Sequence, residues 1–407
     1  MIKMTSKRLK DKKVPNLRFP GFEGEWETKT LGEISQLITK GTTPKKFTNQ
    51  GIKYIKIESF KENSIDIEKC MFIDEITHNK ELKRSILREG DILFAIAGAT
   101  IGKTNIVTKA VLPANTNQAL AIIRLNEKEV KSYIIQILKS AIMQKYIKES
   151  ISVGAQPNLN LEQINSFSFC YPNIEEQKKI ASFLSLINER IITQNKIIEE
   201  LEQLIKGLCQ KLFHNRNNKD WSEQSIEDVL EERKEVNTDN YTVHSVSVSK
   251  GVINQIEYLG RSFAAKDTKN YNVVHYGDIV YTKSPTGEFP YGIIKQSFIK
   301  ERVAVSPLYG VFRAKSFYMA NILHFYFSNP INVQNYLQSI IQKGAKNTIS
   351  ITNQSFLKKR LYLPIDEKEI KKISSLLSAI ESKKTVEMNI LERLKNQKKH
   401  FLQQMFI

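Results

Sequence analysis

The sequence predicts a mixed α/β protein with two similar domains, separated by two long antiparallel coiled-coil helices and related by a pseudo-twofold internal repeat. Three observations lead to this fold class. A heptad pattern occurs twice, short landmarks recur at a nearly constant offset, and strand-like segments lie between the heptads. The expected parts are a basic tail (1–13), a first domain (14–172), a central spacer helix (173–215), a second domain (216–364) and a C-terminal spacer helix (365–407).

The first heptad pattern extends from Ile174 to Phe213. Its apolar residues follow one another mainly at steps of four and three, which is typical of a helix that packs along another helix. These residues are Ile180, Leu184, Ile187, Ile191, Ile198, Leu201, Ile205, Leu208 and Leu212. Adding 193 to the heptad positions gives a second, mostly apolar series between Glu367 and Phe406. The same long helix is therefore expected twice.

Three landmarks repeat in the same order along the chain. Trp26 recurs as Trp221 at an offset of 195, Gly90–Phe94 recurs as Gly277–Tyr281 at an offset of 187, and Lys178–Ile180 recurs as Lys371–Ile373 at an offset of 193. One matching tryptophan could be chance, but three ordered landmarks and a shared heptad phase indicate an internal duplication of about 190 residues.

Each domain is expected to be rich in strands and to end in a helical region. In the first domain we expect strands at 52–57, 91–97 and 118–125, another strand after Lys103, and a helix over 128–149. In the second domain we expect strands at 242–248, 278–282 and 303–312, and a helical region over 319–342 that Pro330 breaks in two. Because the connections to the central helix are short, that helix should deliver the chain to the second domain, and the C-terminal helix should run back antiparallel to it.

The composition is basic, with 61 Lys+Arg against 43 Asp+Glu and a formal net charge of +18. Either a generally lysine-rich proteome or a polyanionic partner, most often nucleic acid, explains this excess. Three widely separated cysteines and six scattered histidines suggest no disulfide framework or metal cluster, which fits a reduced, cytoplasmic protein. The N-terminus lacks the apolar core of a signal peptide, and the longest apolar run, 92–102, is too short to span a bilayer.

Two enzyme motifs are considered and rejected. Ala97–Thr104 matches a relaxed phosphate-loop pattern, but such a loop needs a helix after it, and Asn105–Thr108 has the character of a strand. Ser284–Tyr291 is faintly similar to an adenine-methyltransferase motif, but it lacks the Asn or Asp and the adjacent prolines. No nucleophile–base pair stands out, and neither does a paired acidic site with a nuclease lysine.

Basic and polar residues on expected loops remain as candidates for DNA binding. They are Thr42, Thr43, Lys45, Lys46, Lys56, Lys103, Thr104 and Asn115 in the first domain, and Lys250, Arg261, Lys266, Lys269 and Lys283 in the second. Taken singly, each cation is explained by a solvated surface charge. Taken together, two basic domains suit a duplex, in which cations bind phosphates and a few side chains contact base edges.

The chain resembles the DNA-specificity subunit of type I restriction–modification systems over essentially its whole length. The motifs that carry this resemblance are Val14–Phe22 with Trp26, Gly41–Pro44, Gly90–Leu93 leading to Gly102-Lys103, Pro113–Gln118, and Pro172 with Glu175–Ile180. The second domain departs from the pattern, because Ser284–Gly287 replaces the Gly-Lys hairpin. Lys103 is therefore no guide to the contacts of that domain.

The resemblance implies that 14–172 and 216–364 are two target-recognition domains, which read the two half-sites of a bipartite double-stranded DNA target. It also implies that the chain has no catalytic activity of its own and that its partners are two methyltransferase subunits and two restriction subunits. No cofactor is expected in this chain, whereas S-adenosylmethionine, ATP and Mg are expected in the partners. Two other classes stay open on the residues alone: a coiled-coil scaffold that binds only proteins, and a phosphate-loop ATPase.

Overall fold

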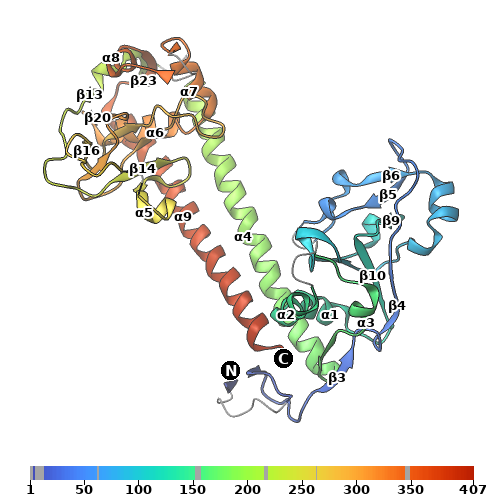
Figure 1. The fold of residues 1–407 in the computed structure, drawn as a ribbon. Helices are drawn as coiled ribbons and strands as arrows, with labels where there is room; N and C mark the ends of the chain where they lie inside the picture. Colours follow the sequence, from blue (N-terminus) through green and yellow to red (C-terminus); the bar gives the residue numbers. More distant parts are fainter. Residues whose placement is uncertain are drawn as a thin grey trace. The chain divides into compact units, whose positions relative to one another are not determined.

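The computed structural model describes residues 3–4, 13–61, 64–151, 157–214, 219–262, 264–343 and 349–407. The chain forms two compact units: unit 1 is Met1–Gln194 with Ile390–Ile407, and unit 2 is Asn195–Asn389. Both units combine helices with sheets, so the predicted mixed α/β class is confirmed (Figure 1). The boundary between the units falls inside both long helices rather than at their ends.

Unit 1 is built around a four-stranded antiparallel sheet. Its order is β4 (Ser35–Lys40), β10 (Leu120–Leu125), β7 (Ile92–Ala95) and β8 (Thr104–Ile106). A second sheet has the order β6 (Met71–Ile73), β5 (Ile52–Ile55) and β9 (Ala114–Thr116). Two strand pairs join β1 (Lys3–Met4) to β2 (Leu17–Arg18) and β3 (Glu27–Thr30) to β11 (Ser168–Tyr171). The short helices are α1 (Lys131–Leu138), α2 (Ala141–Ser150) and α3 (Leu161–Asn165).

Strand β7 is apolar on both sides because both faces of its sheet are covered. Ile92 and Phe94 pack in the core that also contains the helices of unit 1, whereas Leu93 and Ala95 pack in a second core on the opposite face. All four side chains are buried. Successive side chains of a strand point to opposite faces, so a strand with two covered faces appears as a continuous apolar run.

Unit 2 repeats the plan of unit 1. Its four-stranded antiparallel sheet has the order β13 (Leu230–Glu232), β20 (Gly310–Ala314), β17 (Ile279–Tyr281) and β18 (Ile294–Gln296). The paired strands are β12 (Trp221–Ser225) with β23 (Arg360–Pro364), β14 (His244–Ser247) with β15 (Gly251–Asn254), β16 (Asn272–Val274) with β19 (Val303–Val305), and β21 (Gln342–Lys343) with β22 (Ile349–Ser350). The helices are α5 (Gln255–Leu259), α6 (Phe317–Tyr326), α7 (Pro330–Leu337) and α8 (Asn353–Leu357).

Several predicted elements differ from the structure in a physically simple way. The helix expected over 128–149 is two helices, because the backbone at Ser140 is extended and the chain restarts as α2. The strand expected over 303–312 is two strands, β19 and β20, with Pro307 between them, where a ladder hydrogen bond could not form. The break at Pro330 is confirmed, since α7 begins on that residue. The predicted basic tail lies mainly outside the described residues, and its residues 3–4 form strand β1.

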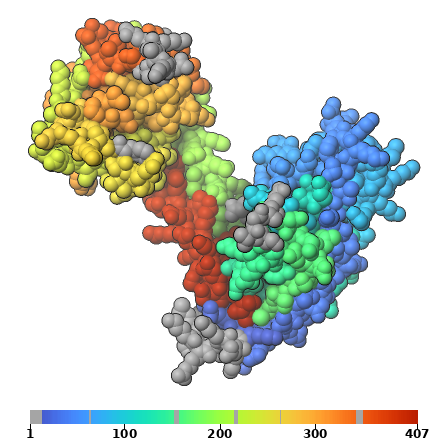
Figure 2. Space-filling view, in the orientation of Figure 1, coloured from blue at the N-terminus to red at the C-terminus, as the bar shows by residue number. Residues whose placement is uncertain are grey.

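The two long helices are α4 (Ile174–His214) and α9 (Glu367–Gln404). In unit 1, the beginning of α4 shares a core with the end of α9: Leu184 and Phe406 are both buried in it. In unit 2, Leu377 and Phe213 are buried together in the same way. Within each unit the helices therefore meet start to end, which is the predicted antiparallel pairing. Figure 2 shows the red end of α9 against green helical parts of unit 1. The rings of Phe406 and Tyr133 are in contact, with centroids 5.6 Å apart.

Each long helix begins at a cap, and its first turn is bonded to a tryptophan at the start of a paired strand, just before β3 in unit 1 and at the first residue of β12 in unit 2. The side chain of Asn173 accepts a hydrogen bond from the backbone N–H of Glu176, and Asp366 does the same for Glu369. The caps use the backbone N–H of these two glutamates, and their carboxylates accept hydrogen bonds from the tryptophans. Trp26 Nε1 donates to Glu176 over 3.1 Å, and Trp221 Nε1 donates to Glu369 over 3.2 Å. The repeated tryptophan thus contacts a repeated glutamate, which recurs at the same offset of 193 as the nearby Lys178–Ile180 landmark.

In unit 1 the contact is reinforced by an ion pair. Arg18 Nε lies 2.7 Å from Glu176 Oε1, and its Nη2 lies 2.8 Å from Oε2. The side chains of Arg18 and Glu176 are 11% and 1% exposed. Removing one member of such a buried pair leaves the other charge without compensation.

Glu176→Gln is accordingly expected to destabilise unit 1 by about 3–5 kcal/mol, because Arg18 stays buried without its counter-charge. Hydrogen exchange read separately on peptides of each unit measures the effect. The matched control is Glu175→Gln on the same helical turn, whose side chain is 74% exposed. Equal loss of protection in the two variants would contradict the assignment.

Unit 2 contains a histidine that must be neutral in the folded state. His324 on α6 accepts a hydrogen bond at Nδ1 from the backbone N–H of Gln296 over 3.1 Å. Burial, followed by the charges of Lys295 and Lys384, lowers the pKa of His324 from 6.5 to about 3. The unfolded chain therefore binds a proton below pH 6.5 that the folded chain does not bind until about pH 3.

The contribution of neutral His324 to the free energy of unfolding of unit 2 is expected to be constant above pH 6.5 and to fall as the pH drops toward 3. The loss at pH 5 is on the order of 1–2 kcal/mol. Hydrogen exchange of unit 2 peptides at pH 5 and pH 7, corrected for intrinsic rates, measures it. His324→Asn, which keeps an acceptor for Gln296, should flatten the pH dependence, and an unchanged slope in that variant would assign the effect to other groups.

Candidate nucleic-acid interface

One end of the four-stranded sheet of unit 1 gathers several of the predicted residues. The register pairs Ala121 with Lys40 and Leu120 with Ala95, and β8 begins opposite Phe94. Strands β4 and β7 therefore finish, and β10 and β8 start, at the same end of the sheet. We call this end, with segments 41–50, 96–103 and 117–119 that extend from it, the loop end of unit 1.

The chain that leaves β4 is held tightly at the loop end. A Cβ on Gly41 would lie 2.0 Å from the carbonyl oxygen of Thr116, so only glycine fits this close approach. Thr42 N donates to the same oxygen over 3.2 Å, and the hydroxyl of Tyr54 donates to Thr42 O over 2.9 Å. Burial raises the pKa of Tyr54 to about 12, so its hydroxyl stays a neutral donor.

Cationic side chains of unit 1 extend from this fixed base. Lys45, Lys46 and Lys103 are exposed and make no ion pair with any described residue. Lys56 is partly buried, and its Nζ lies 5.1 Å from the ring centroid of Phe47. Thr43, also exposed, donates its hydroxyl to the side chain of Gln118. The structure thus brings the predicted residues of 42–56 together at one place, and Lys103 lies at the same end of the sheet.

Thr104 and Asn115 are placed differently from what the sequence suggested. Thr104 is 4% exposed, and its hydroxyl donates to Gly102 O over 3.0 Å. Asn115 is 0% exposed; its amide donates to Leu82 O over 3.0 Å, and its oxygen meets His78 Nδ1. Buried and satisfied side chains cannot contact a duplex directly. The proposed direct role is therefore corrected to one of supporting the neighbouring chain.

The corresponding end of unit 2 carries Lys283. Tyr281 at the end of β17 pairs with Gly310 and Ile294, which begin β20 and β18. Lys283 follows directly, with a left-handed backbone at φ 56° that is uncommon for a residue other than glycine. Burial lowers the pKa of Lys283, against the opposing effect of Glu232. Lys283 is therefore a less solvated cation than the lysines of unit 1.

The other predicted residues of unit 2 lie on separate segments. Lys250 is exposed at the turn of the β14–β15 hairpin. Arg261, Lys266 and Lys269 are exposed on the irregular chain that follows α5. In unit 2 the predicted cations therefore come from three segments of the chain, namely the β14–β15 turn, the stretch after α5 and the stretch after β17.

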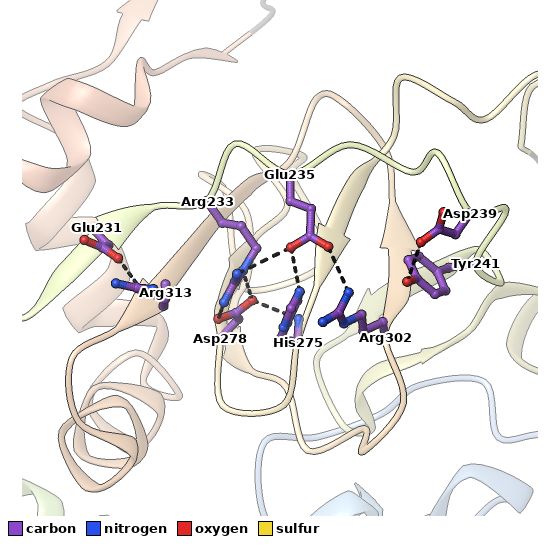
Figure 3. Close-up of polar contacts among 9 residues, drawn as sticks. All are labelled: Glu231, Arg233, Glu235, Asp239, Tyr241, His275, Asp278, Arg302 and Arg313. Carbon is purple, nitrogen blue, oxygen red and sulfur yellow. Dashed lines mark hydrogen bonds and ion pairs between the residues drawn. The ribbon is translucent and has the colours of Figure 1, made fainter.

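The chain that leaves β13 has an ionic network that sequence reasoning missed (Figure 3). Glu235 meets three cationic or titratable groups: His275 Nε2 at 2.7 Å, and Arg233 Nη1 and Arg302 Nη1 at 3.6 Å each. Nearby, the hydroxyl of Tyr241 donates to Asp239 over 2.8 Å. The carboxylate of Glu235 is thus compensated within unit 2. His275 and Arg302 are far from Glu235 in the sequence, so no local spacing predicted this network.

The same network contains a buried ion pair that has a counterpart in unit 1. Arg233 donates twice to Asp278, over 2.6 and 2.9 Å. In unit 1 the matching landmark residue, Asp91, receives two bonds of 2.7 Å from Arg124, which lies on β10 instead. The carboxylate is therefore kept in both units, whereas the arginine that compensates it comes from different strands.

The structure argues against the alternative chemistry considered for 97–104. This segment leads into strand β8, so no helix N-terminus follows Lys103 to direct amides at a phosphate, and the phosphate-loop interpretation is wrong. Within the described part of the chain, no group of three or more His, Cys, Asp and Glu side chains is placed to hold a metal ion. None of the described helices is both long and apolar enough to cross a bilayer.

Comparison with known families gives a match that covers most of unit 1 and the next residues of α4. Residues 23–203 match the family described as "Type I restriction modification DNA specificity domain". A putative type I restriction enzyme MjaX specificity subunit from Methanocaldococcus jannaschii is 31% identical over 194 residues, which are 46% of this chain and 45% of that protein. The type I restriction enzyme EcoBI specificity subunit from Escherichia coli is 25% identical over 181 residues, 42% of this chain and 36% of that protein. The chain matches less than half the length of these relatives.

Solved structures extend the likeness of fold to both units. The S subunit of a type I restriction–modification system from M. genitalium gives a TM-score of 0.62 at 13% identity, covering 97% of this chain and 99% of that one. A chain from a structure of type I R-M complex assembly and conformational transition gives a TM-score of 0.53 at 13% identity, covering 93% and 96%. At this identity the likeness concerns the fold alone.

The position of Lys103 leads to a prediction about duplex binding. Lys103→Ala should weaken binding to any DNA duplex and lower the slope of log affinity against log salt by about 1, because a phosphate contact releases counterions without specifying a base. Titrations at several salt concentrations measure the slope. Lys109→Ala, an exposed lysine beyond the other end of β8, is the matched control. A loss confined to one DNA sequence would contradict the phosphate assignment.

Proposed function

Because residues 23–203 match the family described as type I restriction modification DNA specificity domain, we propose that the whole chain is the DNA-specificity subunit of a type I restriction–modification complex. The observation that carries this proposal is the repetition of the family domain's plan. Unit 2, which lies almost entirely beyond the family match, has the same sheet order, the same helix cap and the same Trp–Glu contact as unit 1.

The repeat supports a target with two half-sites. In this proposal each unit contacts one half-site through the segments at the loop end of its sheet. The two sets of segments differ in chemistry: unit 1 presents the exposed Lys45, Lys46 and Lys103, whereas unit 2 carries the partly buried Lys283. Different side chains favour different base edges, so two unlike half-sites are expected.

The chain itself is proposed to be non-catalytic and to direct partner subunits. In the proposed complex, two methyltransferase subunits supply S-adenosylmethionine and methylate an adenine in each half-site, and two restriction subunits use ATP and Mg. A chain with two similarly built units suits a pair of identical partners, because it offers the same surface twice. The proposed location is the cytoplasm, where DNA and these partners are found together.

Mapping methylated adenines in a host that expresses this chain with its cognate methyltransferase tests the proposal. A bipartite methylated sequence that appears only when the chain is present is the expected result. A coiled-coil scaffold would leave no such sequence and would show no salt-sensitive DNA binding. A phosphate-loop ATPase would turn over ATP as the isolated chain.

Exchange of one unit gives a sharper prediction. Replacing Trp26–Cys170 with the corresponding part of a related specificity subunit should change one half-site and leave the other intact, because each sheet carries its own loops. The methylated sequence of the exchanged protein is the measurement. If both half-sites changed together, independent recognition by the two units would be excluded.

A further inference from the structure

An aromatic side chain stands at the loop end of unit 1, between the exposed lysines. Phe47 follows Lys45 and Lys46 in the chain and is 37% exposed. Phe47 is not itself a member of any buried apolar cluster of the described residues, and more than a third of its surface stays in water. A ligand that covers it would remove that exposed surface from water.

The backbone on both sides of Phe47 is fixed. Thr42 is held by Thr116 and Tyr54, as described above. After Phe47, Thr48 N donates to Phe72 O over 2.9 Å, and the Thr48 hydroxyl donates to Gln50 O over 2.8 Å. The short stretch 44–47 is therefore a tip between two anchored points. A preorganised tip binds with a smaller loss of conformational entropy than a free loop.

The ring of Phe47 is also oriented. It packs edge to face against Tyr54, with centroids 5.3 Å apart and an interplanar angle of 69°. The ammonium of Lys56 lies 5.1 Å from its centroid, within the range of a cation–π contact. Tyr54 is fully buried, so the ring rests on a rigid support.

The chemistry of the ring limits what it can recognise on a duplex. A phenyl ring has no donor or acceptor and cannot distinguish the polar groups of the base edges. The apolar group that the major groove displays is the 5-methyl group of thymine. The flanking lysines suit the phosphates that border that groove.

We propose that Phe47 packs against the 5-methyl group of a thymine in the half-site contacted by unit 1, and that Tyr54 and Lys56 act as positioning residues for its ring. This inference rests on the proposed function, because it needs a specific duplex. It deepens that function by naming one recognised group and the side chain that recognises it.

Deoxyuridine, which is thymidine without the 5-methyl group, tests the inference. Once methylation mapping has given the target, each thymine of the two half-sites is replaced in turn, and the affinity of the complex with its methyltransferase is measured. At one thymine of one half-site, the wild-type complex should lose about fourfold in affinity, the factor for burying one methyl group. With Phe47→Ala, replacement at that thymine should have no further effect.

Two further variants separate this contact from general effects. Lys45→Gln should weaken binding to all duplexes while keeping the loss at that thymine. Phe47→Leu retains an apolar side chain and should keep part of the affinity loss on deoxyuridine replacement. It therefore tests the contact even if the alanine variant misfolds. Lys56→Gln should reduce the loss at that thymine, because the ring of Phe47 then lacks its cation–π partner.

The outcomes are distinguishable from failure of the proposed function. If the wild-type complex does not prefer its mapped target over an unrelated duplex, the proposed function is wrong and the deoxyuridine series has no basis. If it prefers the target but is indifferent to deoxyuridine at every thymine, the Phe47 assignment alone is overturned. The assignment also fails if Phe47→Ala retains the full fourfold loss.

Discussion

Neither unit completes its core with one long helix. Unit 1 buries Leu184 near the start of α4 together with Met405 just beyond the end of α9, and unit 2 buries Leu377 and Phe213 from the opposite ends of the same helices. The apolar seam of each helix is thus divided between two cores. The heptad repeat in the sequence records this double use, and the loops at the sheet ends depend on a scaffold that both helices stabilise.

The repeat keeps several contacts that support the scaffold, but it does not keep every partner in them. The helix cap, the Trp–Glu contact and the buried aspartate at the start of β7 and β17 occur in both units. The arginine that compensates that aspartate does not: Arg124 lies on β10 and Arg233 follows β13. A buried carboxylate must be paired, but the pairing charge is free to come from any strand that reaches it. That freedom allows the surrounding segments to diverge.

Local patterns predicted the parts of the fold that local physics determines. The heptads, the apolar run of β7 and the break at Pro330 are visible in neighbouring residues. The single strand predicted over 303–312 was wrong because the prediction followed the apolar residues and ignored Pro307, which separates β19 from β20. The candidate site was harder, because burial depends on distant residues. Asn115 is buried and bonded to His78 and Leu82, and the ammonium of Lys56 lies near the ring of Phe47. Spacing along the chain does not predict these contacts.

The chain has two tryptophans, and the structure gives one to each unit, in the same chemical setting. Trp26 and Trp221 are 3% and 4% exposed, and each indole donates to a glutamate in the first turn of a long helix. The chain therefore contains a matched pair of built-in fluorophores. With one of them changed to phenylalanine, the emission of the other reports on the helix junction of a single unit, so the two halves of a duplicated protein can be followed separately by light.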